Sequence, residues 1–237
     1  MSLDGKVIVI SGGSRGVGGA IAKVLAENGG ILWLLARTRK ELVKTVKSIV
    51  SSGGQAFYCT CDVSSATQVG ECVNSVLDRS GRIDVLINNA GIWVEGETTA
   101  ISAERIERVF RVNSIGAIYL TRAILPAMRE RRDGHVINIV SLAGIEPSSQ
   151  WGVYAASKYA LRGFAESLRL EVEAEGIKVT SLYPGGIDTG MYRLAGYPDK
   201  VHEPWMMSKD VLADVVLFVL TRPSDVLIDQ VVIRKFT

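Results

Sequence analysis

Short apolar runs alternate with longer stretches of helical period along the whole chain, and this alternation constrains the fold more than any other feature. Seven runs are predicted to be strands: residues 7–10, 31–35, 55–59, 85–87, 135–140, 178–182 and 226–233. Six stretches are predicted to be helices: residues 18–28, 40–51, 66–79, 103–131, 154–175 and 209–220. Such alternation implies parallel strands joined by crossover helices. We therefore expect an α/β fold with a doubly wound, mostly parallel sheet of about seven strands and helices on both faces.

No Pro/Gly/Ser-rich linker and no internal repeat interrupts this pattern, so residues 1–237 are predicted to form one domain. Hydrophobic residues make up 47% and charged residues 22%, which excludes the disordered and fibrous classes. A net charge of +2 is too small to predict a nucleic-acid or anionic-membrane partner. The start, Met1 to Asp4, lacks the features of a signal peptide, and no run reaches the roughly 18 apolar residues that span a bilayer. We expect a cytoplasmic protein without a membrane partner.

The three cysteines, Cys59, Cys61 and Cys72, are odd in number and crowded into one stretch. This is not the pattern of a secreted disulfide framework, so we expect reduced thiols. No metal site is predicted, because the two histidines, His135 and His202, lie far away in sequence.

A glycine-rich segment, residues 11–18, follows the first predicted strand directly and reads Ser-Gly-Gly-Ser-Arg-Gly-Val-Gly. Glycine permits left-handed turns and a close approach of the backbone to a pyrophosphate, which then lies at the positive end of the following helix. A tight turn is the alternative, but the position between strand and helix favours a dinucleotide site. The candidate residues are Gly12, Ser14, Arg15, Gly16, Val17 and Gly18.

The residues after the second and third predicted strands bear on the choice of dinucleotide. The second strand is followed by Ala-Arg-Thr-Arg, without the acidic residue that often binds the ribose 2′-hydroxyl of NAD. Arg15 and Arg37 could instead bind a 2′-phosphate, although two solvated surface arginines are the alternative. NADP(H) is therefore the preferred prediction and NAD(H) the second. Asp62 could approach the adenine amino group with Val63 beside the ring, or Asp62 could cap the next helix; both remain open.

Tyr154 and Lys158 stand four residues apart in a predicted helix, so both side chains project from one face. An ammonium group beside a phenol stabilises phenolate and moves a pKa of about 10 toward working pH. That would suit Tyr154 to general acid/base catalysis. Such a pair arises often by chance, but Ser141 follows the fifth predicted strand, at the carboxyl edge where doubly wound sheets bind ligands.

Further motifs follow in order, and with them the chain resembles the short-chain dehydrogenase/reductase superfamily, in its branch of single-domain enzymes with a Rossmann fold. The resemblance covers nearly the whole length and rests on residues 11–18, Asp62-Val63, Asn88-Asn89-Ala90-Gly91, Asn113, Ser141, Tyr154, Lys158, Pro184-Gly185 and Thr189. It implies an NAD(P)-dependent oxidoreductase acting on a CH–OH group, which interconverts a carbonyl compound and an alcohol by hydride transfer.

The resemblance also implies roles for individual residues. Ser141 would hold and polarise the substrate oxygen, and Tyr154 would give or take its proton. Lys158 would bind the nicotinamide ribose and lower the pKa of the phenol, while Asn113 would anchor a water in a proton relay. Both Tyr154 and Lys158 would therefore also touch the cofactor. The remaining cofactor contacts implied are Asn89, Ala90, Gly91, Pro184, Gly185, Ile187 and Thr189.

Two departures from the family pattern are visible. Ser11 stands where the family more often has Thr, which keeps a hydroxyl. Residues 226–234 lack the glycine-rich ending of many tetrameric members, which argues against assembly through that edge and leaves pairing through the two long helices. A homodimer or homotetramer is expected. This ending is more similar to members that act on 3-hydroxy acids, serine-type substrates and miscellaneous carbonyls than to 3-oxoacyl reductases.

Alternative functions are a 3-hydroxy acid or serine-type dehydrogenase, a 3-oxoacyl reductase and, from another class, a non-catalytic dinucleotide sensor. A sugar-nucleotide epimerase would need a longer chain. Substrate choice is predicted to depend on residues 145–153 and 190–207, with Trp93 beside them. The second segment is rich in aromatic residues and methionine, as an apolar lid would be, or it is a surface excursion packed on the core. His202 within it is expected to be a loop histidine, and residues 129–132 a solvated helix end.

Overall fold

The computed structural model describes residues 2–200 and 202–236, and its strands form one sheet in which every pairing is parallel. Met1 and Thr237 of the predicted domain, and Val201 of the predicted lid, lie outside the described residues. The strands are β1 (Val7–Ser11), β2 (Ile31–Ala36), β3 (Gln55–Thr60), β4 (Val85–Asn88), β5 (Gly134–Ile139), β6 (Ile177–Pro184) and β7 (Gln230–Ile233). Their order is β3-β2-β1-β4-β5-β6-β7. The predicted seven-stranded, doubly wound fold is confirmed.

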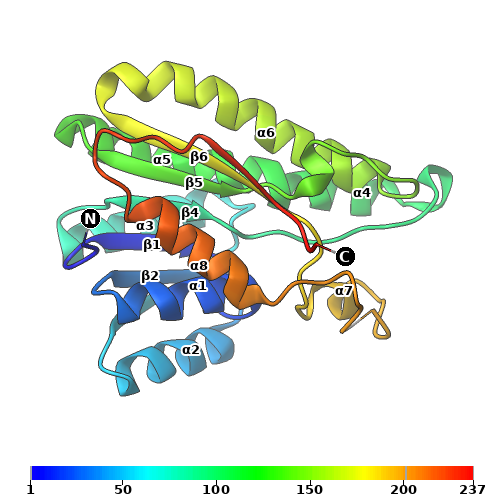
Figure 1. Cartoon of the computed structure of the whole chain (residues 1–237), viewed down its shortest axis with the longest axis horizontal. Coiled ribbons are helices and arrows are strands. Elements are labelled where there is room, and N and C mark those ends of the chain that lie inside the picture. Colours follow the sequence, from blue (N-terminus) through cyan, green and yellow to red (C-terminus); the bar gives the residue numbers. More distant parts are fainter. Residues whose placement is uncertain (1, 201, 237) are drawn as a thin grey trace.

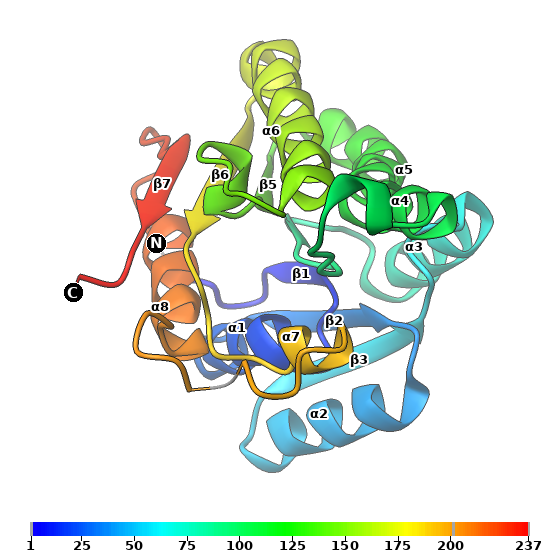
Figure 2. The ribbon, with the colours of Figure 1, turned by 90° about the vertical axis from the view of Figure 1, so that its right-hand side faces the viewer.

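The order of the strands reverses beside β1. The chain runs outward from β1 to β3, crosses back, and continues from β4 to β7 on the other side (Figures 1 and 2). At such a switch point the loops after neighbouring strands diverge, and a crevice opens outside their carboxyl ends. The loops after β1 and β4 therefore border the crevice in which a ligand of this fold would lie.

Helices cover both faces of the sheet, as predicted (Figures 1 and 2). The helices are α1 (Gly16–Glu27), α2 (Arg39–Ser51), α3 (Ala66–Ser80), α4 (Ala103–Phe110), α5 (Gly116–Arg131), α6 (Gly152–Val172), α7 (Met191–Leu194) and α8 (Lys209–Leu220). The helices α1, α2 and α8 pack on one face, and α3, α5 and α6 pack on the other. Among the described residues, no helix combines the length and the apolar character that crossing a membrane requires.

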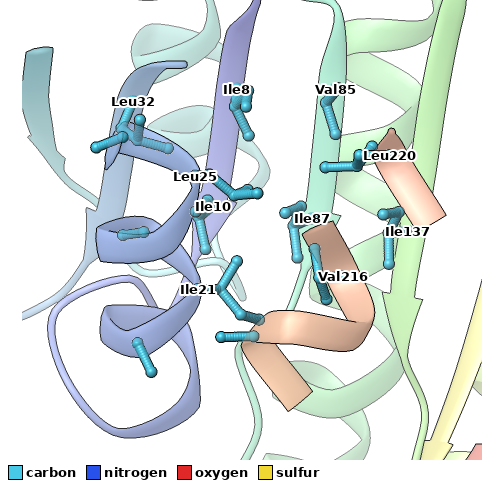
Figure 3. Packing of buried hydrophobic residues seen from close by; sticks show 14 of the residues in the cluster. Ile8, Ile10, Ile21, Leu25, Leu32, Val85, Ile87, Ile137, Val216 and Leu220 are labelled. Atoms are coloured by element: carbon cyan, nitrogen blue, oxygen red, sulfur yellow. The ribbon is translucent and has the colours of Figure 1, made fainter. Parts of the chain in front are cut away.

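The core follows from strands that are buried on both faces. Alternate residues of β1 point in opposite directions, so Ile8 and Ile10 pack toward α1 and α8, while the other apolar residues of β1 pack toward α3 and α5. In Figure 3, Ile8 and Ile10 lie against Ile21 and Leu25 of α1, with Val216 of α8 beside them. Each such side chain contributes about 1.5–3 kcal/mol when it is fully buried. This packing holds α1 and the glycine loop before it in place.

Several predicted boundaries differ from the observed ones, and three of the differences matter most. The stretch 103–131 is two helices, α4 and α5, separated by a π-helical turn at Arg111–Ile115. The last strand begins at Gln230 and not at residue 226. The first helix begins at Gly16, two residues earlier than predicted, so Gly16 belongs to its first turn.

The expectation of reduced thiols is wrong for one pair, because Cys59 and Cys72 form a disulfide. Cys59 lies near the end of β3 and Cys72 lies in α3, and their Cα atoms are 5.9 Å apart. Counting cysteines along the sequence could not reveal that this strand and helix adjoin. Cys61 is free and buried, and its burial, with Asp62 and Glu71 nearby, raises the pKa of its thiol to about 11.

The edge of the sheet opposite the crevice is held by a buried carboxylate. Asp84, just before β4, accepts hydrogen bonds from the backbone N–H of Val7 at 2.8 Å and from Arg131 at 2.8 Å. Arg82 also binds it, and Lys6 lies 3.7 Å away. Burial alone would raise the pKa of Asp84, but these donors outweigh it and hold the pKa below its usual range. Arg131 is thus a structural cation, where a solvated helix end is predicted.

Candidate active site

The glycine loop between β1 and α1 forms a cradle that side chains would fill. Gly12 and Gly16 have φ values of +65° and +55°, in the left-handed region that favours glycine. A Cβ on Gly18 would lie 2.3 Å from the carbonyl oxygen of Gly12. No side chain caps the start of α1, and its first turn carries no acidic residue. The first N–H groups of this helix, which have no partner within it, are therefore suited to bind an anionic group.

Hydrogen bonds tie this loop to the end of β4. The Ser11 hydroxyl accepts the backbone N–H groups of Asn89 and Ala90, each at 3.0 Å. In return the Asn89 side-chain amide donates to the carbonyl oxygens of Ser11 at 2.9 Å and Gly12 at 3.3 Å. The hydroxyl at position 11 thus joins the two loops of the switch point, and serine provides it as well as threonine would.

Asp62 does not cap the helix that follows it. Ser65 is the N-cap of α3, and its side chain accepts from the backbone N–H of Gln68. The Asp62 carboxylate accepts instead from the backbone and the hydroxyl of Ser64, at 2.9 and 2.7 Å. Partial burial raises its pKa, but the bonds to Ser64 and the charges of Arg37 and Arg108 outweigh this and lower the pKa. Of the two predicted roles, the cap is excluded.

Arg15 and Arg37 lie at the same end of the cleft but in different surroundings. The Arg15 guanidinium donates to Glu41 in the first turn of α2, at 2.7 Å. Arg37 is exposed at the end of β2. Sequence analysis missed Glu41, although an acidic residue in the first turn of the helix after β2 is a usable signal. Of the two arginines, Arg37 is therefore the one without a salt bridge among the described residues.

Ser141 and Tyr154 meet at the other end of the cleft. Tyr154, in the first turn of α6, is only 5% exposed, and the Ser141 hydroxyl lies near enough to its phenol to lower the pKa of the phenol. Ser141 follows β5 with φ of 119° and ψ of 153°, a conformation that residues with a Cβ rarely adopt. Burial raises the pKa of Tyr154, the nearby Ser141 hydroxyl offsets part of this, and Tyr192 raises the pKa further. The phenol is therefore protonated at neutral pH.

Lys158 does not bring the pKa of Tyr154 down toward neutrality, contrary to the sequence-based expectation. Its ammonium group donates to the backbone carbonyl of Ile139 at 3.1 Å and lies 5.8 Å from the centroid of the Tyr154 ring. Burial lowers the pKa of Lys158 to about 8. Both groups lie in an apolar interior, where desolvation favours the neutral form of each and outweighs their mutual attraction.

Asn113 lies in the π-helical turn between α4 and α5 and is 1% exposed. Its side-chain oxygen accepts from the backbone N–H of Ile92 at 2.8 Å, and its amide donates to Ile92 and to Ser157. Asn113 therefore fixes the loop after β4. A Cβ on Gly91 would lie 3.5 Å from the Asn113 oxygen and 3.7 Å from the Lys158 ammonium. Glycine at position 91 leaves a space that these two polar groups border.

These parts line one cleft of about 840 Å³. Except for Asn113, which lies behind the wall, every predicted site residue lines it: Gly12, Ser14, Arg15, Gly16, Val17, Gly18, Arg37, Asp62, Val63, Asn89, Ala90, Gly91, Ser141, Tyr154, Lys158, Pro184, Gly185, Ile187 and Thr189. Trp93 and parts of the two predicted substrate segments also line it. Arg105 and Arg108, which sequence analysis missed, reach it from α4, and their spacing of one helical turn was the available signal.

Comparison with known proteins shows which family has a similar sequence and fold. A family model described as short chain dehydrogenase matches residues 6–196. A ketoacyl reductase of Nostoc is 36% identical over 191 residues, which cover 80% of this chain and 67% of that protein. The structure of an alcohol dehydrogenase from the archaeon Thermococcus sibiricus, complexed with 5-hydroxy-NADP, has a TM-score of 0.90 and 30% identity, covering 97% and 96% of the two chains. A metagenomic short-chain oxidoreductase in complex with NADP has a TM-score of 0.87 and 33% identity over the whole of both chains.

A doubly wound parallel sheet with a glycine cradle at its switch point, facing a serine and a buried tyrosine, defines a class of nucleotide-dependent oxidoreductases. Within that class, the chain belongs to the short-chain dehydrogenase family.

Proposed function

We propose that this enzyme interconverts a carbonyl compound and an alcohol, with NADP(H) as its preferred cofactor and NAD(H) as the second. The observation that carries the proposal is the meeting of the Ser141 and Tyr154 hydroxyls in the same cleft as the glycine cradle. The name of the Nostoc relative, a ketoacyl reductase, supports carbonyl chemistry. A sensor that only binds dinucleotide would have no use for a buried, protonated phenol beside a second hydroxyl.

The residues at the cleft fit a nicotinamide dinucleotide. The uncapped start of α1 and the glycine cradle suit its pyrophosphate, Asp62 and Val63 suit its adenine, and Lys158 suits its nicotinamide ribose. When bound, the nicotinamide would supply the hydride for reduction or accept it in oxidation. The substrate oxygen is then left to the side chains of the protein.

Tyr154 and Ser141 handle that oxygen in the proposed reaction. The Ser141 hydroxyl donates to the carbonyl oxygen and stabilises the negative charge that develops on it. Tyr154 gives its proton to the same oxygen, which completes the alcohol. Because burial keeps the phenol protonated, Tyr154 is at neutral pH in the form that carbonyl reduction requires of an acid. Alcohol oxidation needs the phenolate, so its rate should rise with pH.

Replacing Tyr154 by Phe tests the proposal. We expect kcat for reduction of a verified ketone to fall about a hundredfold to ten-thousandfold, which is the usual contribution of general acid catalysis. NADPH binding, followed by protein fluorescence, should change little. Tyr159→Phe is the matched control, because Tyr159 lies on the same helix but is 40% exposed and its hydroxyl donates to the Ile145 carbonyl. Turnover by Tyr154→Phe equal to that of the control would refute the role.

The preference for NADP(H) is proposed to depend on Arg37. This exposed guanidinium lies at the adenine end of the cleft and forms no salt bridge within the described part of the chain, whereas Arg15 is bound by Glu41. A charge-assisted contact to phosphate, reduced by solvent exposure, corresponds to about a tenfold preference. Arg37→Asp should therefore weaken NADPH binding by at least about tenfold and leave NADH binding nearly unchanged.

Arg39→Asp is the control for this measurement, because it makes the same change of charge at a residue that binds the Tyr58 hydroxyl outside the cleft. Titration of both cofactors into the wild type and the two variants gives, for each variant and each cofactor, the ratio of its dissociation constant to that of the wild type. Equal dissociation constants for NADPH and NADH in the wild type would contradict the assignment. The single domain over residues 1–237, the homodimer or homotetramer and the cytoplasmic location stay predictions from the sequence.

A further inference from the structure

We infer that the substrate carries an uncharged aromatic ring next to its carbonyl or carbinol carbon. This inference rests on the proposed carbonyl–alcohol chemistry and adds the chemical class of the substrate. Its basis is a wall of aromatic side chains, called here the aromatic wall, that begins beside the Tyr154 ring and lines the cleft. The aromatic wall consists of Trp93, Trp151, Tyr192 and Trp205, all of which line the cleft.

The rings of the aromatic wall are arranged to pair with one another and with Tyr154. The Trp93 ring centroid lies 4.3 Å from that of Tyr154. Trp151 and Tyr192 each approach Trp93 at 5.1 Å, with interplanar angles of 78° and 66°. Trp205 meets Tyr192 at 6.0 Å and 84°. Aromatic pairs prefer these edge-to-face arrangements, and a planar ring bound among them can form the same kind of contact.

The aromatic wall is built from segments far apart in the chain, and Glu95 holds them together. Its carboxylate accepts from the Trp93 indole at 3.2 Å and from Lys200 at 2.8 Å, and its backbone carbonyl accepts the Tyr197 hydroxyl at 2.9 Å. The Glu95 side chain is 15% exposed. The segment that carries Tyr192 is therefore pinned to the loop that carries Trp93, so the rings form one surface.

Trp205 is fixed in a different way. A Cβ on Gly186 would lie 1.9 Å from a ring carbon of Trp205, so the indole packs directly on the Gly186 backbone. A backbone hydrogen bond also joins the two segments on either side of this contact, because the N–H of Met207 donates to the Gly186 carbonyl at 2.9 Å. Although Trp205 is 42% exposed, this contact holds its ring over the cleft.

The charges at this end of the cleft do not favour a charged substrate. The Arg234 guanidinium is bound by the Glu146 carboxylate, and Lys235 is exposed at the rim. Lys158 is buried, and its ammonium is already bonded to the Ile139 carbonyl. Arg105 and Arg108 also reach the cleft, but they lie exposed on α4 and not in the aromatic wall. None of the side chains of the aromatic wall carries a charge, so a carboxylate placed against these rings would be desolvated there, which is costly.

Three ketones of similar size test the inference: acetophenone, cyclohexyl methyl ketone and 4-acetylbenzoate. The first two differ in the aromaticity of the ring, and the third adds a carboxylate. We expect kcat/KM to be highest for acetophenone, with KM lower by about three- to tenfold than for the saturated ketone, as edge-to-face contacts would give. The carboxylate should lower kcat/KM by at least about tenfold.

Two variants separate ring contacts from intrinsic reactivity. Trp93→Leu should abolish most of the difference in KM between acetophenone and cyclohexyl methyl ketone, whereas Trp93→Phe, which keeps an aromatic ring, should retain it. A saturated or carboxylated ketone used as well as acetophenone by the wild type would overturn the inference and leave the proposed carbonyl chemistry intact. Equal ratios in Trp93→Leu and Trp93→Phe would also overturn it. Failure to reduce any ketone, including small aliphatic ones, would instead refute the proposed function.

Discussion

Ser141 combines a hydroxyl that the reaction needs with a backbone that its Cβ disfavours. A non-glycine residue at φ of 119° and ψ of 153° costs roughly 1–3 kcal/mol. The conformation orients the hydroxyl so that it accepts from the N–H of Ala143 and reaches the Tyr154 phenol. The chain after β5 thus gives up stability at the residue that the proposed mechanism places on the substrate oxygen.

This strain predicts that Ser141→Gly and Ser141→Ala differ in stability but not in activity. Both lose the hydroxyl, and with it about a hundredfold to a thousandfold in kcat. Glycine relieves the strain of roughly 1–3 kcal/mol and gives back up to about 1 kcal/mol through its freer unfolded chain. Urea unfolding should therefore show Ser141→Gly to be about 1 kcal/mol more stable than Ser141→Ala. A glycine variant less stable than the alanine variant would contradict the strain.

At this scale the sequence could predict which residues share the cleft but not their partners. The glycine segment, Ser141, Tyr154 and Lys158 follow from motifs that a parallel sheet brings to one edge. The bond between Arg15 and Glu41 depends on the path of α2, which no local pattern shows. The direction of the pKa of Tyr154 depends on how deeply the phenol is buried, and the spacing to Lys158 carries no information about that.

At the scale of helices and strands, the two edges of the sheet have different roles. The carboxyl ends of the strands carry the cleft, whereas the opposite edge carries the Asp84 cluster, which ties β1, β4 and α5 together. The Asp84 side chain is 2% exposed, while Arg82 and Arg131 are 40% and 28% exposed. Removing the charge of Asp84 would therefore leave two neighbouring guanidinium groups without their buried partner.

Asp84→Asn should lower the free energy of unfolding by about 2–4 kcal/mol at pH 7, less than for a fully buried pair because solvent screens the arginines. The matched control is Asp133→Asn, whose carboxylate is 55% exposed and pairs with Lys6 and Arg131. That variant should lose less than about 1 kcal/mol. Because the pKa of Asp84 is lowered in the folded state, its contribution is present above pH 4 and is lost as the pH falls below it. Equal losses in both variants would contradict this account.

The elements themselves were largely predictable, and their interruptions were not. Each observed strand overlaps a predicted one, because strands buried on both faces are continuous apolar runs. The π-helical turn that holds Asn113 lies in a stretch of unbroken helical period, and it forms there because the Asn113 side chain binds the backbone of Ile92. The Cys59–Cys72 disulfide likewise depends on a tertiary contact between β3 and α3.

At the scale of the whole molecule, the lowered pKa of His135 predicts how the free energy of unfolding depends on pH. Its Nε2 lies 2.8 Å from the Thr180 hydroxyl, which donates its own proton to the Ile228 carbonyl, so Nε2 is the donor in this contact. Burial above all, helped by Lys178 and opposed by Asp133, lowers the pKa of His135 to about 4. Below pH 6.5 His135 therefore binds a proton in the unfolded chain, whereas in the folded protein it is protonated only near pH 4.

The free energy of unfolding should accordingly fall between pH 6.5 and pH 4 and level off below, as far as His135 contributes. The expected loss is about 1–3 kcal/mol, since the side chain is only partly shielded from solvent. Urea unfolding of the wild type and of His135→Gln from pH 8 to pH 4 measures it. The stability difference between the two proteins should narrow or reverse toward pH 4. A constant difference over this range would show that His135 is not the group responsible.

The strand order also fixes the moment at which the cleft comes into being during synthesis on a ribosome. When residue 60 has emerged, β1, β2 and β3 can pair, and the glycine loop is present. The strand that pairs with the other side of β1, and the serine and tyrosine across the cleft, are translated later, and Trp205 later still. A nascent chain therefore contains the glycine loop long before it contains the complete cleft. Only a chain translated as far as Lys235 holds every residue that lines the cleft.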